Sequence, residues 1–120
     1  DRVLVLGYRE DASRYLSVAD VFVLPSRNEG LPIAVLEALR AGVPVVATAL
    51  AEIAEAVDDG RTGCLVPPDD AAALAEALRR TVAPGARAAF GDAGREVFAT
   101  RYRLDAMTRA YERLYAAAPA

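Results

Sequence analysis

Two glutamates, Glu29 and Glu37, flank the start of an expected helix and are the residues of this chain best suited to chemistry. A carboxylate only accepts hydrogen bonds, so each glutamate suits the hydroxyl groups of a sugar or a ribose. Gly30 lets a ligand approach the backbone closely, and the free N–H groups at a helix start attract an anion such as phosphate. Hydroxyl, phosphate and hydroxyl groups in a row describe a nucleotide sugar.

The segments around the two glutamates predict the elements that position them. Residues 21–24 form a short apolar run that ends at a proline, a pattern typical of a strand buried on both faces of a parallel sheet. Pro32 suits the first helical position, and Gly42 suits the end of the same helix. Glu29 is therefore expected in a loop at the carboxyl end of a strand, with Glu37 about a turn and a half into the helix. Ligands of open α/β sheets bind at this edge.

The remaining elements are expected between the glycines, prolines and aspartates that punctuate the chain. Strands are expected at residues 3–6, 21–24, 43–47 and 64–66. Helices are expected at residues 11–18, 32–42, 52–57, 71–82, 86–100 and 104–117. Asp11 is expected to cap the first helix, and Asp69 or Asp70 the fourth. Strands that alternate with helices predict an α/β fold with a parallel sheet, and the helices at the end of the chain are expected to cover one side of it.

Length and composition limit the class of protein. A chain of 120 residues fits one domain, and a net charge of −3 argues against a nucleic-acid ligand, which needs clustered positive charge. The arginines at residues 79, 80, 101 and 103 are expected at helix ends or in solvent instead of on a phosphate. No apolar run reaches the roughly 18 residues of a membrane span, so a cytoplasmic chain is expected. The single Cys64 is expected to be a small buried apolar residue.

Metal binding is not expected from the acidic pairs of the chain. The pairs at residues 58–59 and 69–70 each precede a turn or a helix start, where carboxylates act as caps. The chain contains no histidine, so zinc bound by histidine and a nucleophile activated by histidine are excluded within it. We therefore expect no metal and no other cofactor.

The run from Asp20 to Ala47, with seven residues between the two glutamates, resembles the nucleotide-sugar motif of the glycosyl transferases group 1 family. These are retaining glycosyltransferases with two Rossmann-like domains, the GT-B fold. The resemblance continues at residues 42–48, 59–68 and 111–115 and covers essentially the whole chain. It implies that residues 1–120 are a partial C-terminal domain, a Rossmann-like parallel sheet followed by helices. The N-terminal acceptor domain, and an upstream arginine and lysine that hold the diphosphate, are expected to be missing from it.

The resemblance implies a function for this domain and roles for its residues. It implies the donor-binding half of a retaining glycosyltransferase that moves a hexose from a nucleotide diphosphate sugar to an acceptor. Glu29 would be the catalytic residue at the reacting carbon, as a nucleophile or a charge stabiliser, and Glu37 would bind the ribose hydroxyls. The other donor-binding positions implied are Gly30, Leu31, Pro32 and Thr48.

The sequence also allows simpler roles for the two glutamates and two different kinds of protein. Without the resemblance, Glu37 would be taken as an exposed helix residue paired with Arg40, and the loop glutamate as part of an ordinary turn. The chain could also be a truncated, non-catalytic module for oligomerisation or regulation, or part of a GT-B sugar-nucleotide epimerase. As a fragment it is expected to be inactive. Its expected partners are the nucleotide-sugar donor, the missing domain, which would also make any contact with the inner membrane, and further copies of itself.

Two features of the chain bear on the local geometry. Residues 51–55 stand where the family often has a Gly-Gly pair and a proline, so this segment is expected to be stiffer and more helical. The family's strand order is 3-2-1-4-5-6, and this chain lacks the first two strands. The strand expected at residues 3–6 must then either move beside the strand at residues 21–24 or leave an apolar edge for another chain to cover.

Overall fold

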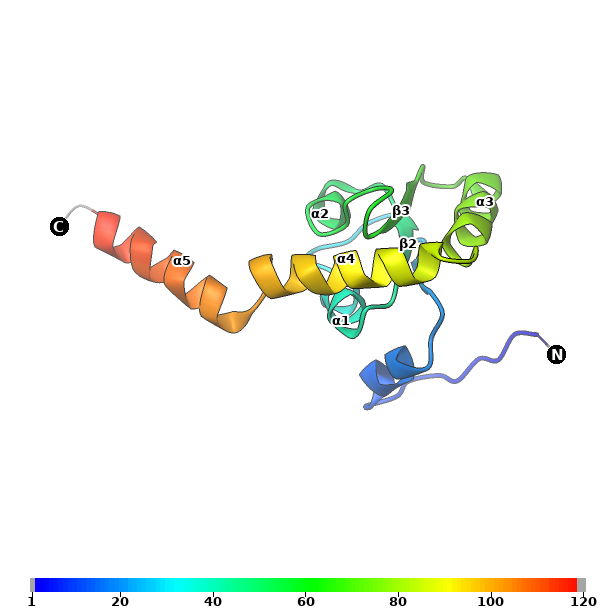
Figure 1. Cartoon of the computed structure of the whole chain (residues 1–120), viewed down its shortest axis with the longest axis horizontal. Coiled ribbons are helices and arrows are strands. Elements are labelled where there is room, and N and C mark those ends of the chain that lie inside the picture. Colours follow the sequence, from blue (N-terminus) through cyan, green and yellow to red (C-terminus); the bar gives the residue numbers. More distant parts are fainter. Residues whose placement is uncertain (1, 119–120) are drawn as a thin grey trace.

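The computed structural model describes residues 2–118 and contains a three-stranded parallel sheet between helices (Figure 1). The strands, in sheet order, are β1 (Phe22–Leu24), β2 (Val45–Thr48) and β3 (Gly63–Val66). The helices are the 3-10 helix η1 (Ala12–Ser17) and the α-helices α1 (Ile33–Ala41), α2 (Ala51–Ala54), α3 (Ala71–Thr81), α4 (Ala86–Arg101) and α5 (Leu104–Ala117). The predicted α/β fold, with a parallel sheet followed by helices, is confirmed.

The central strand β2 is buried along its whole length and separates two apolar clusters. Because side chains alternate along a strand, Val45 and Ala47 face one side of the sheet and Val46 faces the other. On the second side Val46 packs with Cys64 of β3 and Ala77 of α3. The predicted burial of Cys64 is confirmed, since only 1% of it is exposed.

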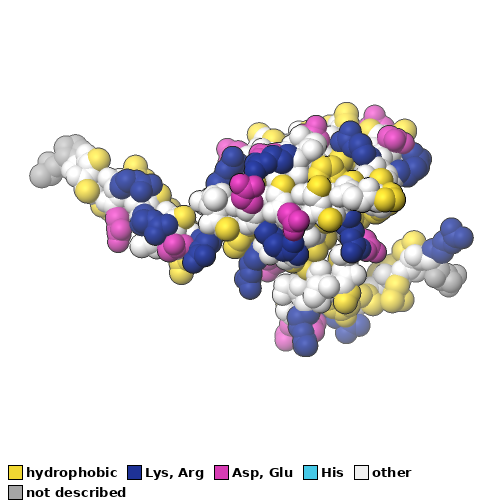
Figure 2. Space-filling model, viewed as in Figure 1, with side chains coloured by type: hydrophobic (Ala, Val, Ile, Leu, Met, Phe, Trp, Pro, Cys, Tyr) yellow, Lys and Arg dark blue, Asp and Glu magenta, His cyan; other side chains and the backbone are white. Residues whose placement is uncertain are grey.

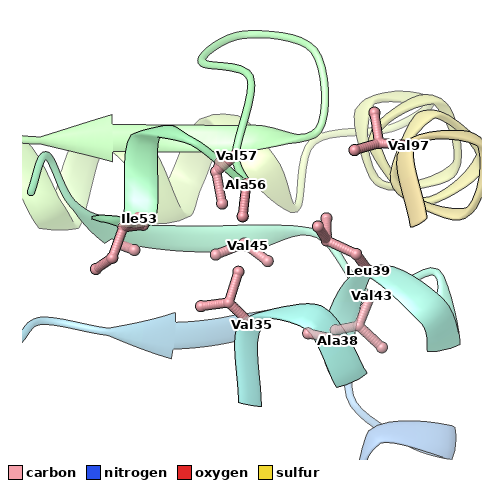
Figure 3. Close-up of a cluster of buried hydrophobic side chains, with 10 residues drawn as sticks. Val35, Ala38, Leu39, Val43, Val45, Ile53, Ala56, Val57 and Val97 are labelled. Atoms are coloured by element: carbon pink, nitrogen blue, oxygen red, sulfur yellow. The ribbon is translucent and has the colours of Figure 1, made fainter. Parts of the chain in front are cut away.

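The larger cluster lies between β2 and the helix that carries Glu37. Val35 and Leu39 of α1 are fully buried, because apolar residues four positions apart share one face of a helix. Ile53 of α2 and Val97 of α4 reach the same cluster from other parts of the chain (Figure 3). Burying a side chain of this size stabilises the fold by about 1.5–3 kcal/mol, so this cluster holds α1 in place on the sheet.

Helix α4 runs across the body of the molecule (Figure 1) and contacts the segments that precede all three strands. The contacts are an ion pair between Arg87 and Asp20 before β1, the backbone of Gly91 against Gly42 before β2, and Glu96 with Arg61 before β3, 2.8 Å apart. The amino edge of the sheet is therefore closed, and the carboxyl edge is left to the loops that can bind a ligand.

The prediction of a strand at residues 3–6 is wrong. Residues 2–9 form neither helix nor strand, and Val3, Leu4 and Val5 are 81%, 81% and 88% exposed. The segment has not moved beside β1, and no strand in residues 2–118 pairs with the outer edge of β1. A strand needs a neighbour for its backbone hydrogen bonds and a layer to cover its side chains, and this segment has neither.

The helix predicted at residues 11–18 is a 3-10 helix, and the side chain of Asp11 makes no capping hydrogen bond. None of its residues is buried, so no packing favours a longer α-helix. The segment at residues 51–55 is largely helical, as predicted. The helix after Pro32 ends at Gly42 in the left-handed conformation, also as predicted, although Pro32 itself is the residue before the first helical one.

Polar contacts at the two ends of α3 bear on the predictions made for Asp70 and Arg80. Asp70 caps α3 by accepting a hydrogen bond from the backbone N–H of Ala73 at 2.8 Å, as predicted. Arg80 is exposed in the last turn of α3, as predicted, and it also contacts Cys64, which was not predicted. Its guanidinium donates to the Cys64 Sγ atom at 3.0 Å, and this hydrogen bond raises the pKa of Arg80.

The prediction that the C-terminal helices cover one side of the sheet holds for α3. It is wrong for α4, which lies along the amino ends of the strands, and for α5, which does not cover the sheet. Helix α5 projects away from the body, so the whole molecule is elongated and measures 61 × 29 × 29 Å, and none of the residues of α5 is buried (Figures 1 and 2). Exposed apolar side chains recur on it every three or four residues. This α5 stripe consists of Leu104, Met107, Tyr111, Leu114 and Tyr115.

Gly91→Ala is expected to destabilise the chain, because the new methyl carbon would overlap the carbonyl oxygen of Gly42. We expect the free energy of unfolding to fall by about 1–3 kcal/mol. Helix propensity alone would raise it by about 0.8–1 kcal/mol, because alanine favours a helix more than glycine does, so a loss must come from the steric overlap. Urea unfolding measures this difference. Gly30→Ala is the matched control, since a Cβ atom there meets nothing within 4 Å. Equal stability of the two variants would contradict the close contact of α4.

Candidate functional site

The predicted catalytic residue lies in the loop that follows β1. Glu29 is half-buried there, and one of its oxygens, Oε1, accepts a hydrogen bond from the Ser26 hydroxyl at 2.5 Å. The next residue, Gly30, is exposed, and an added Cβ atom would point into open space. Packing within the chain therefore does not require a glycine at this position, whereas close approach of a ligand would.

The start of α1 lies directly after this loop. Pro32 is buried and precedes the helix, and no side chain caps the helix start. The N–H groups of the first turn, at Ile33 and Ala34, therefore lack partners within the helix. Leu31 and Ile33 expose 64% and 66% of their surfaces on either side of Pro32. The helix start is thus accessible and suits an anionic or hydroxylated group.

Glu37 is exposed on α1 and lines a hollow of about 280 Å³. The other walls of this hollow include Ser13, Arg14 and Leu16 from η1, and Arg40 from α1. The loop glutamate does not line it, so a single cleft shared by both carboxylates stays a prediction. The alternative pairing with Arg40 is not observed as an ion pair in the described part of the chain.

Thr48 ends β2 at the same edge of the sheet and is only 3% exposed. Its carbonyl oxygen accepts a hydrogen bond from Leu50, and the N–H of Ala49 donates to Val66 of β3, both at 2.8 Å. The chain therefore turns sharply after β2. Because the Thr48 side chain is buried, the backbone of this turn is the part that could border a ligand.

An ion pair that joins the loops after β1 and β3 was missed by the sequence analysis. Arg27 Nε lies 2.7 Å from Asp69 Oδ1, and both side chains are exposed. Asp69, expected as a possible cap, adopts a left-handed conformation with φ of 59°, which aspartate tolerates better than most residues. Local sequence patterns do not report a pair 42 positions apart. The Ser26 contact, by contrast, follows a Ser-x-x-Glu spacing that could have been noticed.

The acidic pair at residues 58–59 has partners within the chain. Asp58 forms ion pairs with Arg61 and Arg101, and Asp59 accepts a hydrogen bond from the N–H of Leu65 at 2.9 Å. Within residues 2–118, no three or more Asp, Glu or Cys residues are grouped so that they could hold a metal ion. No helix in that range is long and apolar enough to span a membrane.

Comparison with known proteins shows the family of the chain. Residues 1–83 match the family model described as Glycosyl transferases group 1. The chain is 40% identical over 88 residues to the amylovoran biosynthesis glycosyltransferase AmsK of Erwinia amylovora, an alignment that covers 67% of this chain and 22% of AmsK.

Two solved structures share the fold. Sucrose-phosphate synthase from Thermosynechococcus elongatus is 38% identical, with a TM-score of 0.75 over 87% of this chain and 27% of that protein. HepE from Anabaena, solved in complex with UDP-glucose, is 24% identical, with a TM-score of 0.85 over 97% of this chain and 33% of HepE.

The chain thus spans between about a fifth and a third of the length of these proteins. Its fold is the α/β fold of the GT-B glycosyltransferases. Since the family model matches 83 of the 120 residues, this chain belongs to the glycosyl transferases group 1 family.

Proposed function

We propose that this chain is the donor-binding half of a retaining glycosyltransferase, which moves a hexose from a nucleotide diphosphate sugar to an acceptor. One observation carries the proposal. This chain belongs to the family, and its Glu29 and Gly30 lie directly before the start of α1, which no side chain caps. This position is at the carboxyl edge of a parallel sheet, where α/β proteins bind ligands. The UDP-glucose complex of HepE, which has the same fold, supports a nucleotide sugar as the ligand.

Each part of the site would act on a different part of the donor. The carboxylate of Glu29 would stabilise the positive charge that develops at the anomeric carbon as the diphosphate leaves. Glu37 would accept hydrogen bonds from the ribose hydroxyls. The backbone amides of Gly30 and Leu31, together with the start of α1, would hold the phosphate or the sugar hydroxyls. The turn after Thr48 would border the same cleft.

The surface of α5 supports the proposal that the chain works as part of a longer protein. The α5 stripe is exposed, and α4 and α5 also line an open hollow of about 1050 Å³, which contains Phe98 and Tyr102 together with several arginines. Apolar surfaces of this kind are stable in water when another surface covers them. We propose that the N-terminal acceptor domain covers this region and supplies the second wall of the active site.

Glu29→Ala and Glu37→Ala are expected to affect different steps in the full-length protein. Glu37→Ala should weaken nucleotide binding by about 1.5–3 kcal/mol, the value of a hydrogen bond to a charged group. Glu29→Ala should mainly lower kcat, because its carboxylate acts on the transition state. Titration calorimetry with nucleotide and steady-state kinetics measure the two effects. Glu76→Ala is the control, an exposed helix glutamate away from the site. A loss of affinity alone in both variants would disprove the role proposed for Glu29.

Transfer is expected to proceed with retention at the anomeric carbon and without a divalent metal. We propose that the helix start and basic side chains of the full-length protein meet the charge of the leaving diphosphate. Activity should therefore survive EDTA, and NMR of the product should show the anomeric configuration of the donor. An inverted product, or activity lost with EDTA and restored by Mg²⁺ or Mn²⁺, would contradict this mechanism.

The isolated 120-residue chain is expected to show no sugar transfer. With one wall of the site, it cannot hold donor and acceptor together, and such orientation contributes about 7–11 kcal/mol in well-ordered sites. The exposed edge of β1 and the α5 stripe should also favour self-association. A transfer assay and analytical ultracentrifugation test both points. A monomer that turns over a nucleotide sugar would refute this expectation.

A further inference from the structure

We propose that Ser26 is a positioning residue, whose hydroxyl holds the carboxylate of Glu29 in the orientation that sugar transfer requires. The inference rests on the proposed catalytic role of Glu29. Ser26 Oγ donates a hydrogen bond to Oε1 of the carboxylate at 2.5 Å, and both side chains are half-buried. This contact engages one oxygen of the carboxylate, Oε1, and we infer that the other oxygen would face the donor.

A glutamate in this loop needs such a partner. Its long side chain loses conformational entropy when it is fixed, and a side chain without a partner would lose that entropy only during the reaction. Its neighbours in the chain, Asn28 and Gly30, are exposed and give it little support by packing. Because a displacement of about 1 Å can lower a rate about 100-fold, a hydroxyl that fixes the carboxylate beforehand affects turnover directly.

The backbone around Ser26 is suited to hold that hydroxyl steady. Ser26 comes two residues after the last residue of β1, and the intervening Pro25 has a restricted φ angle. On its other side, Arg27 is linked to Asp69 in the loop after β3. The hydroxyl is thus supported by two parts of the sheet edge, the arrangement expected for a group that orients a reacting residue.

The test is steady-state kinetics of the full-length protein with Ser26→Ala. We expect kcat to fall about tenfold to 100-fold, the equivalent of one hydrogen bond to a charged group, while KM for the nucleotide sugar stays within about twofold. Ser26→Thr keeps the hydroxyl and should restore most of kcat. Ser26→Cys keeps the size but is a weak donor, and should resemble the alanine variant. Ser17→Ala is the matched control, because Ser17 donates to the Arg14 carbonyl at 2.7 Å, away from the loop.

A double-mutant cycle separates this inference from the proposed function. In the Glu29→Ala background, Ser26→Ala should have no further effect on kcat, because the group that it positions is gone. If Glu29→Ala alone keeps the wild-type kcat, the proposed function fails. If Glu29→Ala loses activity but Ser26→Ala does not, only the role of Ser26 fails. An equal loss in both backgrounds, a change confined to KM, or no recovery with threonine would likewise overturn it.

Discussion

The close contact between α4 and the end of α1 is the constraint on which the rest of this structure depends. Gly91 lies so near the carbonyl group of Gly42 that no larger residue fits between the two backbones. This approach lets α4 lie across the amino ends of the strands and bring Val97 into the main apolar cluster. With the amino edge closed, the loops at the carboxyl edge are the part of the sheet that remains free to meet a ligand.

That edge combines rigid and accessible parts. Pro32 and Thr48 are buried and anchor the loops, whereas Gly30 and the start of α1 are open to solvent. The Ser26 hydrogen bond and the link from Arg27 to the loop after β3 act on the same short segment. An exposed ion pair such as that of Arg27 contributes only about 0–1 kcal/mol to stability. Its main effect is therefore to position the loop after β1.

Two parts of the surface are left uncovered: one edge of the sheet and one apolar face of a helix. Within residues 2–118, no strand pairs with the outer edge of β1, and every side chain of the α5 stripe is exposed. Both features fit the proposal that the chain works inside a longer glycosyltransferase. Residues 3–6, although apolar, remain exposed, form no strand and do not pair with this free edge of β1.

The sequence by itself determined the elements whose signals are local. The apolar runs at β1, β2 and β3, the proline and glycine that bound α1, and the aspartate that caps α3 act through neighbouring residues, so their positions could be predicted. The prediction that Glu29 and Gly30 lie in a loop between a strand and a helix also came from a contiguous motif, and the structure places them between β1 and α1. Tertiary structure alone decided the course of α4, the projection of α5, the failure of residues 3–6 to form a strand and the pairing of Arg27 with Asp69. Each of these features depends on whether distant parts of the chain meet in the folded structure. A local sequence pattern carries no information about such contacts.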